Sequence, residues 1–396
     1  MRMFWLELLA AMALTLAALA TGTRAMAMDG LDAALGKALF DRQWVAAPAS
    51  TDTADGLGPL FNARACAACH QGGGGARFPV GQHGLAPDGL VVRLTDGSGA
   101  PHPVLGRQLQ THAIAGFAAE GQATWQNGAV RVTLADPRQA VRQEVRQAPS
   151  LRVMRMIEQV DEDALIRSAD PDDANGDGIS GRVRKVGDGK GGTAAGRFGL
   201  KAAHVTLEAQ IADAFAFDLG LSSLFEPRPS GDCTAAQAQC LRAPSGVSPA
   251  TESQEISRQM IALTADYLRT LKPQRAAAPP PALFTATGCA ACHAPALPAR
   301  GGQTVTLYSD LLLHDLGAQD GGEVIEADAG TSEWRTAPLV DLAAEGGLRR
   351  FMHDGAAATL EDAIARHGGE AATSAAAFRN LNRKDKDALL QFLSSL

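Results

Sequence analysis

The sequence predicts a mainly α-helical protein in which two similar domains, with β-strand insertions, flank a loop-rich middle region. The first observation is a ten-residue stretch that occurs twice, reading FNARACAACH at 61–70 and FTATGCAACH at 284–293. Seven of the ten positions are identical, including both cysteines and the histidine. The second observation is helical periodicity, which is clearest in the apolar series Ile256, Met260, Leu263, Tyr267 and Leu271.

Each repeat contains C-x-x-C-H, the pattern by which c-type cytochromes attach haem covalently. The two thiols bond to one porphyrin, and the histidine that follows becomes the proximal ligand of the iron. A structural zinc site would need two such C-x-x-C pairs close together. A redox C-x-x-C site needs no following histidine, so both alternatives fit less well. The sequence therefore predicts two cytochrome c-like domains, with haem 1 on Cys66, Cys69 and His70, and haem 2 on Cys289, Cys292 and His293.

Length and composition set the class of protein and its compartment. A chain of 396 residues with 46% hydrophobic residues can form two or three packed domains, and a net charge of −7 argues against a nucleic-acid partner. An apolar run at 8–20, followed by Ala25-Met26-Ala27, predicts a signal peptide over 1–27 and export to the periplasm. The alternative is an uncleaved anchor. No later segment is apolar for long enough to span a membrane, so no span is expected in the mature chain.

The N-terminal domain is expected over residues 28–150. It begins with a predicted helix at 32–40, for which Asp32 is the expected cap. The stretch 71–77 contains four consecutive glycines, which either lets the backbone lie close to a porphyrin or forms a flexible loop. Alternating residues at 89–95 and 129–134 predict a β-hairpin or small sheet inserted into the helical domain.

The middle region is expected over residues 151–275. Apolar spacing predicts one or two helices within 151–168, a helix from about Leu207 to Leu219, and a helix from Gln254 to Leu271. Two cysteines remain after the haem motifs, Cys233 and Cys240. In an oxidising compartment this pair predicts a disulfide, with a free-thiol redox pair as the alternative.

An acidic stretch in the middle region resembles half of a calcium-binding loop. Asp173, Asn175 and Asp177 are spaced to present alternate side-chain oxygens to one cation, which predicts a Ca²⁺ site. The twelfth position of the loop is Arg184 and not glutamate, so other ligands would have to complete the site. A plain Asx-rich turn without metal is the alternative.

The C-terminal domain is expected over residues 276–396, after a proline-rich linker. Within it, Thr359 to His367 reads as a short helix with a capping-box pattern, with Arg366 and His367 in its last turn and Gly368 as its stop. His367 therefore lies at the end of a helix that can be aimed at a fixed target. The alternative is a histidine that stabilises the helix dipole.

Taken together, these motifs resemble the di-haem oxidoreductase family labelled as thiol oxidoreductases or peroxidases. That family is related to bacterial di-haem cytochrome c peroxidases and MauG-type proteins. The resemblance runs through most of the mature chain, in the stretches 54–70, 170–182, 196–202, 310–317, 334–339 and 351–371.

The resemblance implies iron ligands beyond the two motifs. In the related peroxidases, the stretch similar to 351–371 supplies the sixth ligand of the C-terminal haem, and the matching position here is His367. Met352 and His353 are the alternatives. For haem 1, a histidine shortly after the first motif can ligate the iron, and His83 is the nearest analogue. An exposed loop histidine is the other reading of His83.

The resemblance also implies a function. We expect an exported di-haem c-type oxidoreductase that exchanges electrons with a small redox protein, with peroxidase-type chemistry at haem 1. The alternative is a pure electron-transfer protein with both haems six-coordinate, serving periplasmic iron acquisition beside an imelysin-type protein. No residue of the sequence identifies itself as catalytic. Trp334 and Trp125 are either relays between the haems or packed aromatics.

Overall fold

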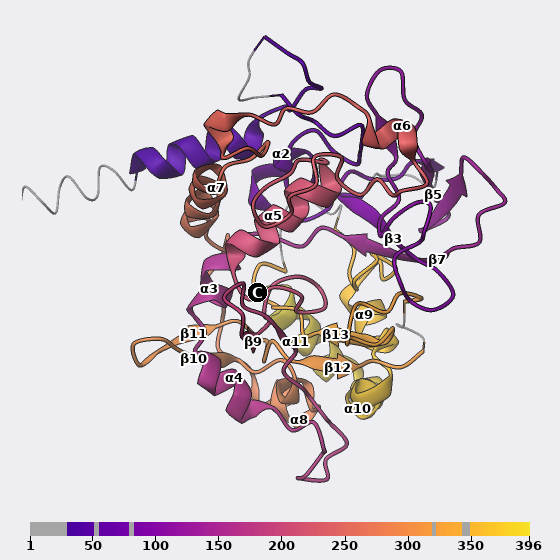
Figure 1. The fold of residues 1–396 in the computed structure, drawn as a ribbon. Helices are drawn as coiled ribbons and strands as arrows, with labels where there is room; N and C mark the ends of the chain where they lie inside the picture. The colour runs from indigo at the N-terminus through magenta and orange to yellow at the C-terminus, as the bar shows by residue number, and fades with distance from the viewer. Residues whose placement is uncertain (1–29, 51–54, 79–82, 319–321, 343–348) are drawn as a thin grey trace, which may run out of the picture.

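The computed structural model describes residues 30–50, 55–78, 83–318, 322–342 and 349–396 (Figure 1). The predicted signal peptide at 1–27 lies outside these residues. The fold is mixed, with 29% helix and 19% strand in small sheets. The prediction of a mainly α-helical protein with β insertions is therefore confirmed only in part, because strands occur more widely than expected. Short antiparallel pairs of strands occur along most of the chain, and such pairs are too short to leave a clear alternation in the sequence.

Among the described residues before 150 there are seven strands, most of them in the insertion after the first repeat. They are β1 (Leu60–Phe61), β2 (His83–Leu85), β3 (Leu90–Thr95), β4 (His112–Ala113), β5 (Gly121–Gln126), β6 (Ala129–Leu134) and β7 (Arg142–Gln147). β3 and β6 lie where alternation predicted strands, but they do not pair with each other. β3 pairs with β7, and β6 pairs with β5 across the turn residues Asn127 and Gly128, which both have positive φ.

Six further strands follow in short antiparallel pairs. They are β8 (Lys185–Gly187) with β9 (Thr193–Ala195), β10 (Ala296–Ala299) with β11 (Gln303–Thr306), and β12 (Leu313–Asp315) with β13 (Glu333–Arg335). β12 and β13 bring the stretch 310–317 beside 334–339, which are two of the segments that carry the family resemblance.

The helices are short, and many of them begin at a side-chain cap. After a helix at 30–41 come α2 (Cys66–Cys69), α3 (Met154–Gln159), α4 (Glu162–Ser168), α5 (Leu207–Asp218), α6 (Ala238–Leu241), α7 (Arg258–Thr270), α8 (Ala282–Ala286), α9 (Leu360–Arg366), α10 (Ala372–Arg379) and α11 (Arg383–Leu393). The 3₁₀ turns are η1 (Gln71–Gly73), η2 (Pro249–Thr251), η3 (Cys289–Ala291) and η4 (Gly369–Ala371). Within the described residues, no helix is long and apolar enough to cross a membrane.

The predicted helices of the middle region are present, and side-chain oxygens explain where they start. Asp161, Thr206 and Ser257 cap α4, α5 and α7 by accepting the N–H group three residues later. The helix at 30–41 differs from the prediction, because it already includes Asp32, which therefore does not cap it.

A single apolar core connects both repeats. The leading phenylalanines of the repeats, Phe61 and Phe284, are 3% and 1% exposed and belong to the same buried cluster. The first helix reaches this core by close contact with α7, since a Cβ atom at Gly36 would lie 1.8 Å from the carbonyl oxygen of Leu263. Because both repeats are anchored in one core, their positions relative to each other are fixed by packing.

Cys233 and Cys240 form a disulfide, with their Cα atoms 6.1 Å apart. Both are buried against Leu60 of β1, just before the first C-x-x-C-H motif. The neighbouring Asp232 accepts hydrogen bonds from the backbone N–H groups of Arg107 and Gln108, each at 2.8 Å. The disulfide loop therefore fastens part of the β insertion beside the first repeat.

Candidate functional site

The two C-x-x-C-H motifs fold alike. In each, the backbone N–H of the histidine donates to the carbonyl of the first cysteine at 3.0 Å, so the motif closes one turn. The first motif forms α2 and the second forms η3. Residues three apart in such a turn lie on the same side, which brings the two thiols of each motif together. All four motif cysteines are free.

In both motif histidines, Nδ1 lies against a backbone carbonyl and Nε2 is the other ring nitrogen. Nδ1 of His70 lies 3.1 Å from the carbonyl oxygen of Gly74, and Nδ1 of His293 lies 3.0 Å from that of Tyr308. A carbonyl only accepts, so Nδ1 carries the proton and Nε2 keeps its lone pair. Histidines that bind metal are held in this way.

Burial keeps these histidines in the neutral form that binds a metal. Desolvation lowers the pKa of His70, and it lowers the pKa of His293 to about 4 with a smaller contribution from His367. A neutral imidazole needs to release no proton before it coordinates iron. Both proximal positions therefore suit a metal at neutral pH.

The thiols of the first motif are protonated rather than reactive. Burial, with a smaller contribution from the charge of Asp218, raises the pKa of Cys66 and of Cys69 to about 12. Redox C-x-x-C pairs need a lowered pKa, because the thiolate is the nucleophile. The half-buried, neutral thiols of this motif therefore do not fit a dithiol redox centre.

His367 faces His293 across a cavity of about 310 Å³. Their ring centroids are 6.4 Å apart. Two imidazoles that share one metal ion, each with a metal–nitrogen bond of about 2.1 Å, place their ring centroids about 6 Å apart. Nδ1 of His367 donates to the carbonyl of Ala363 at 2.8 Å, so its Nε2 is left for a metal. The residues present therefore fit a haem iron held between two histidines.

The alternative ligands lie in the same cavity. Met352 and His353 both line it. The ring of His353 is stacked on Trp334, with centroids 3.7 Å apart and an interplanar angle of 14°, and the Nζ atom of Lys201 lies 4.0 Å from the centre of the Trp334 ring on which it packs. Trp334 is thus a packed aromatic that lines the cavity. Trp125 is buried against Phe78 in the β insertion.

α9 and two glycines place His367. Thr359 accepts the N–H of Asp362 at 3.0 Å and starts the helix, and His367 ends it. A Cβ atom at Gly368 would lie 2.7 Å from the carbonyl oxygen of Leu316, and one at Gly369 would lie 2.2 Å from that of Asp315. The glycines therefore allow this segment to lie directly against residues 315–317, in addition to ending the helix.

Replacing Gly369 with alanine is expected to move the segment that carries His367. The φ of +49° at this position disfavours a side chain, and the new Cβ atom would collide with backbone that cannot yield easily. We expect a lower melting temperature and partial loss of the low-spin spectrum of haem 2. Gly187→Ala is the matched control, because no atom lies within 4 Å of a Cβ at that site. Equal behaviour of the two variants would contradict this reading.

The glycine run after the first motif is packed against residues 148–152. A Cβ atom at Gly75 would lie 2.8 Å from the carbonyl oxygen of Ala148, and Arg152 donates to the carbonyl of Gly72 at 3.0 Å. Gly74 and Gly75 also line the cavity between His293 and His367. The chain that follows the first haem motif thus forms part of the wall of the second site.

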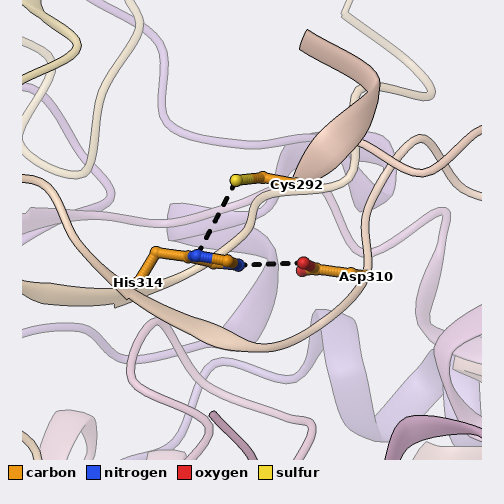
Figure 2. A group of neighbouring side chains, drawn as sticks. All are labelled: Cys292, Asp310 and His314. Carbon is orange, nitrogen blue, oxygen red and sulfur yellow. Dashed lines mark hydrogen bonds and ion pairs between the residues drawn. The ribbon is translucent and has the colours of Figure 1, made fainter. Parts of the chain in front are cut away.

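The structure brings together residues that the sequence did not single out. Asp310 and Glu370 flank His314 beside Cys292 (Figure 2 shows Cys292, Asp310 and His314). Cys292, Asp310 and His314 are also the group of potential metal-binding side chains found among the described residues. Cys292 already belongs to the second haem motif, so a separate metal site there is not supported.

The acidic loop satisfies its side chains with its own backbone. Asp173 accepts the N–H of Gly178 at 3.1 and 3.2 Å, Asn175 accepts that of Asp177, and Asp177 accepts that of Ile179. The contacts of Asn175 and Asp177, each with the N–H group two residues later, are those of Asx turns. Calcium binding stays a prediction. So does ligation of haem 1 by His83, which begins β2 opposite Gln126.

Comparison with known proteins gives one match that covers most of the chain. A family model described as "Di-haem oxidoreductase, putative peroxidase" matches residues 120–396. No curated protein matches the chain. Among solved structures, hydrazine synthase of Kuenenia stuttgartiensis is similar, with 22% identity and a TM-score of 0.25, over 37% of this chain and 57% of that chain. At that TM-score the likeness supports no conclusion about fold or activity.

Proposed function

Because the chain belongs to the di-haem oxidoreductase family described as "putative peroxidase", we propose that it transfers electrons through two covalently attached haem c groups. A haem held by two histidines exchanges single electrons, whereas a haem with an open side also binds small ligands such as peroxide. Cys66, Cys69 and His70 would hold haem 1, and Cys289, Cys292, His293 and His367 would hold haem 2.

One observation carries this proposal. His293 and His367 face each other in a cavity whose wall includes Gly74 and Gly75, and the carbonyl of Gly74 also accepts a hydrogen bond from Nδ1 of His70. A short hydrogen-bonded stretch of backbone thus connects the proximal histidine of one site to the wall of the other. Two redox groups held this way are suited to exchange electrons within the chain.

The division of roles follows from the histidines. A second imidazole supports haem 2 as the electron-transfer group, which would exchange electrons with a small redox protein. Haem 1 is then the candidate for peroxidase-type chemistry. The amino-terminal apolar run further supports a periplasmic location, where covalent haem attachment and the Cys233–Cys240 disulfide are both compatible with the surroundings.

The spin states of the oxidised protein test this division. Electron paramagnetic resonance is expected to give one low-spin signal, from haem 2, and one high-spin signal, from haem 1 in the form without the His83 ligand. Added peroxide should change the high-spin signal first. Two low-spin signals that do not respond to peroxide would instead support a pure electron-transfer protein with both haems six-coordinate.

His367→Ala is expected to convert the low-spin signal of haem 2 into a high-spin signal, because it removes one of the two nitrogens. The covalent haem content should stay the same, since Cys289, Cys292 and His293 are untouched. His353→Ala is the matched control, because His353 lines the same cavity but is stacked on Trp334. A low-spin signal that survives His367→Ala and disappears in His353→Ala would reverse the ligand assignment.

A further inference from the structure

His314 is bracketed by two carboxylates at the edge of the second haem motif. Its Nε2 lies 2.8 Å from Oδ2 of Asp310, and its Nδ1 lies 2.8 Å from Oε2 of Glu370. Ionised carboxylates only accept hydrogen bonds, so both ring nitrogens must donate and the imidazole must be positively charged. The surroundings agree, since they raise the pKa of His314 to about 12 and lower that of Glu370 to about 2.

This cation lies against the attachment point of haem 2. Nδ1 of His314 is 3.7 Å from Sγ of Cys292 (Figure 2). Asp310 is also hydrogen-bonded to the motif through its backbone, because its N–H donates to the carbonyl of Cys292 at 2.9 Å. His314 is only 3% exposed, so water screens its charge weakly.

The neighbouring chain holds the imidazole in place. A Cβ atom at Gly181 would lie 2.5 Å from Cε1 of His314, so backbone covers one side of the ring. Glu370 is fixed in turn by the N–H of Asp315 at 3.0 Å and by the N–H and hydroxyl of Ser180 at 2.9 and 3.0 Å. These contacts leave His314 little freedom to move away from the sulfur.

We propose that His314 is a positioning residue of haem 2, whose fixed positive charge at Cys292 raises the reduction potential of that haem. This rests on the proposed function, which places a haem on Cys289 and Cys292. Reduction adds one electron to the haem and makes its charge less positive. A buried cation nearby stabilises the reduced form, and a buried anion stabilises the oxidised form. His314 thus offsets the low potential that two histidine ligands favour.

The net charge of the cluster around His314 can be changed in both directions by single substitutions. Asp310, His314 and Glu370 together carry a net charge of −1, because two carboxylates face one imidazolium. His314→Gln makes this net charge −2, Glu370→Gln makes it 0, and the double variant restores −1. Arg335, whose pKa is lowered to about 10 by burial and partly restored by Asp310, is the same in all of them.

The reduction potential of haem 2 should rise and fall with the net charge of these three side chains. In spectroelectrochemical titrations at about pH 8, well above the ordinary pKa of carboxyl groups, we expect a lower potential for His314→Gln and a higher one for Glu370→Gln. The double variant should return close to the original protein. A purely structural role would not produce opposite shifts that cancel. If His314→Gln fails to fold with haem, the upward shift in Glu370→Gln still tests the proposal.

His102→Gln is the matched control, because His102 is also buried but accepts the N–H groups of Val104 and Leu105 and contacts no carboxylate among its hydrogen bonds in the described chain. Unchanged potentials in both His314→Gln and Glu370→Gln, with low-spin haem 2 present, would overturn the role of His314. Absence of covalent haem on Cys289 and Cys292 in the original protein would instead overturn the proposed function. The two failures are therefore distinguishable.

Discussion

Replacing both Cys289 and Cys292 with serine is expected to remove one of two covalent haems and leave the other in place. The thioether bonds of haem 2 depend on these two sulfurs, whereas Cys66 and Cys69 lie in a separate turn. A haemochrome assay on the denatured protein should find half of the original haem, and mass spectrometry should locate the remainder on the peptide that contains His70.

The disulfide offers the matched control for this experiment. Cys233 and Cys240 are also a pair of neighbouring cysteines, but they are buried and joined to each other by a disulfide. The double serine variant at these positions should keep two haems, with a lower melting temperature. An unchanged haem content in the Cys289/Cys292 variant would show that the second motif does not attach haem.

Replacing Asp341 with alanine is expected to cost about 3–5 kcal/mol of unfolding free energy, the range found when one partner of a buried ion pair is removed. Asp341 is 2% exposed and accepts hydrogen bonds from Ser150 Oγ at 2.7 Å, Arg152 at 3.1 Å and the N–H of Gln274 at 3.0 Å. Its loss would leave the buried Arg152 without this carboxylate. Urea unfolding monitored by circular dichroism measures the change.

Two companion variants separate charge from conformation at this position. Asp341 has a φ of +72°, which asparagine tolerates better than most residues, so Asp341→Asn should lose less stability than Asp341→Ala. Asp387→Ala is the exposed control, because its pair with Arg383 lies at the surface and should contribute little to stability. A cost for Asp341→Ala as small as that control would contradict the buried role.

The local features of this site could be predicted from the sequence. C-x-x-C-H fixes its geometry within five residues, so a pattern alone predicts the two turns and their cysteines. The end of α9 was equally readable, because Thr359 and Gly368 mark the two ends of a short helix that carries His367. Contacts between distant residues were not readable. Glu370 reaches His314 only because two glycines allow backbone against backbone, which no periodicity reveals.

The fold class was the weaker prediction for a related reason. Caps and apolar spacing made the helices predictable from the sequence. Strands such as β1, β4 and β12 contain only two or three residues, which is too few to show an alternating pattern. The hairpin between β5 and β6 had a readable signal in Asn127-Gly128, the dipeptide typical of tight turns. The pairing of β3 with β7 had no such signal in the sequence, because β7 lies far along the chain and its register is set by the tertiary fold.

The shared wall at Gly74 has a thermodynamic consequence. Nδ1 of His70 bonds to the carbonyl of Gly74, and Gly74 faces the space between His293 and His367. Charge that accumulates at one of the proposed haem irons would therefore change the surroundings of the other. Linkage requires this influence to be reciprocal, so the penalty that the first electron imposes on the second is the same whichever haem is filled first. The measured potential of each proposed haem would then depend on whether the other is oxidised or reduced.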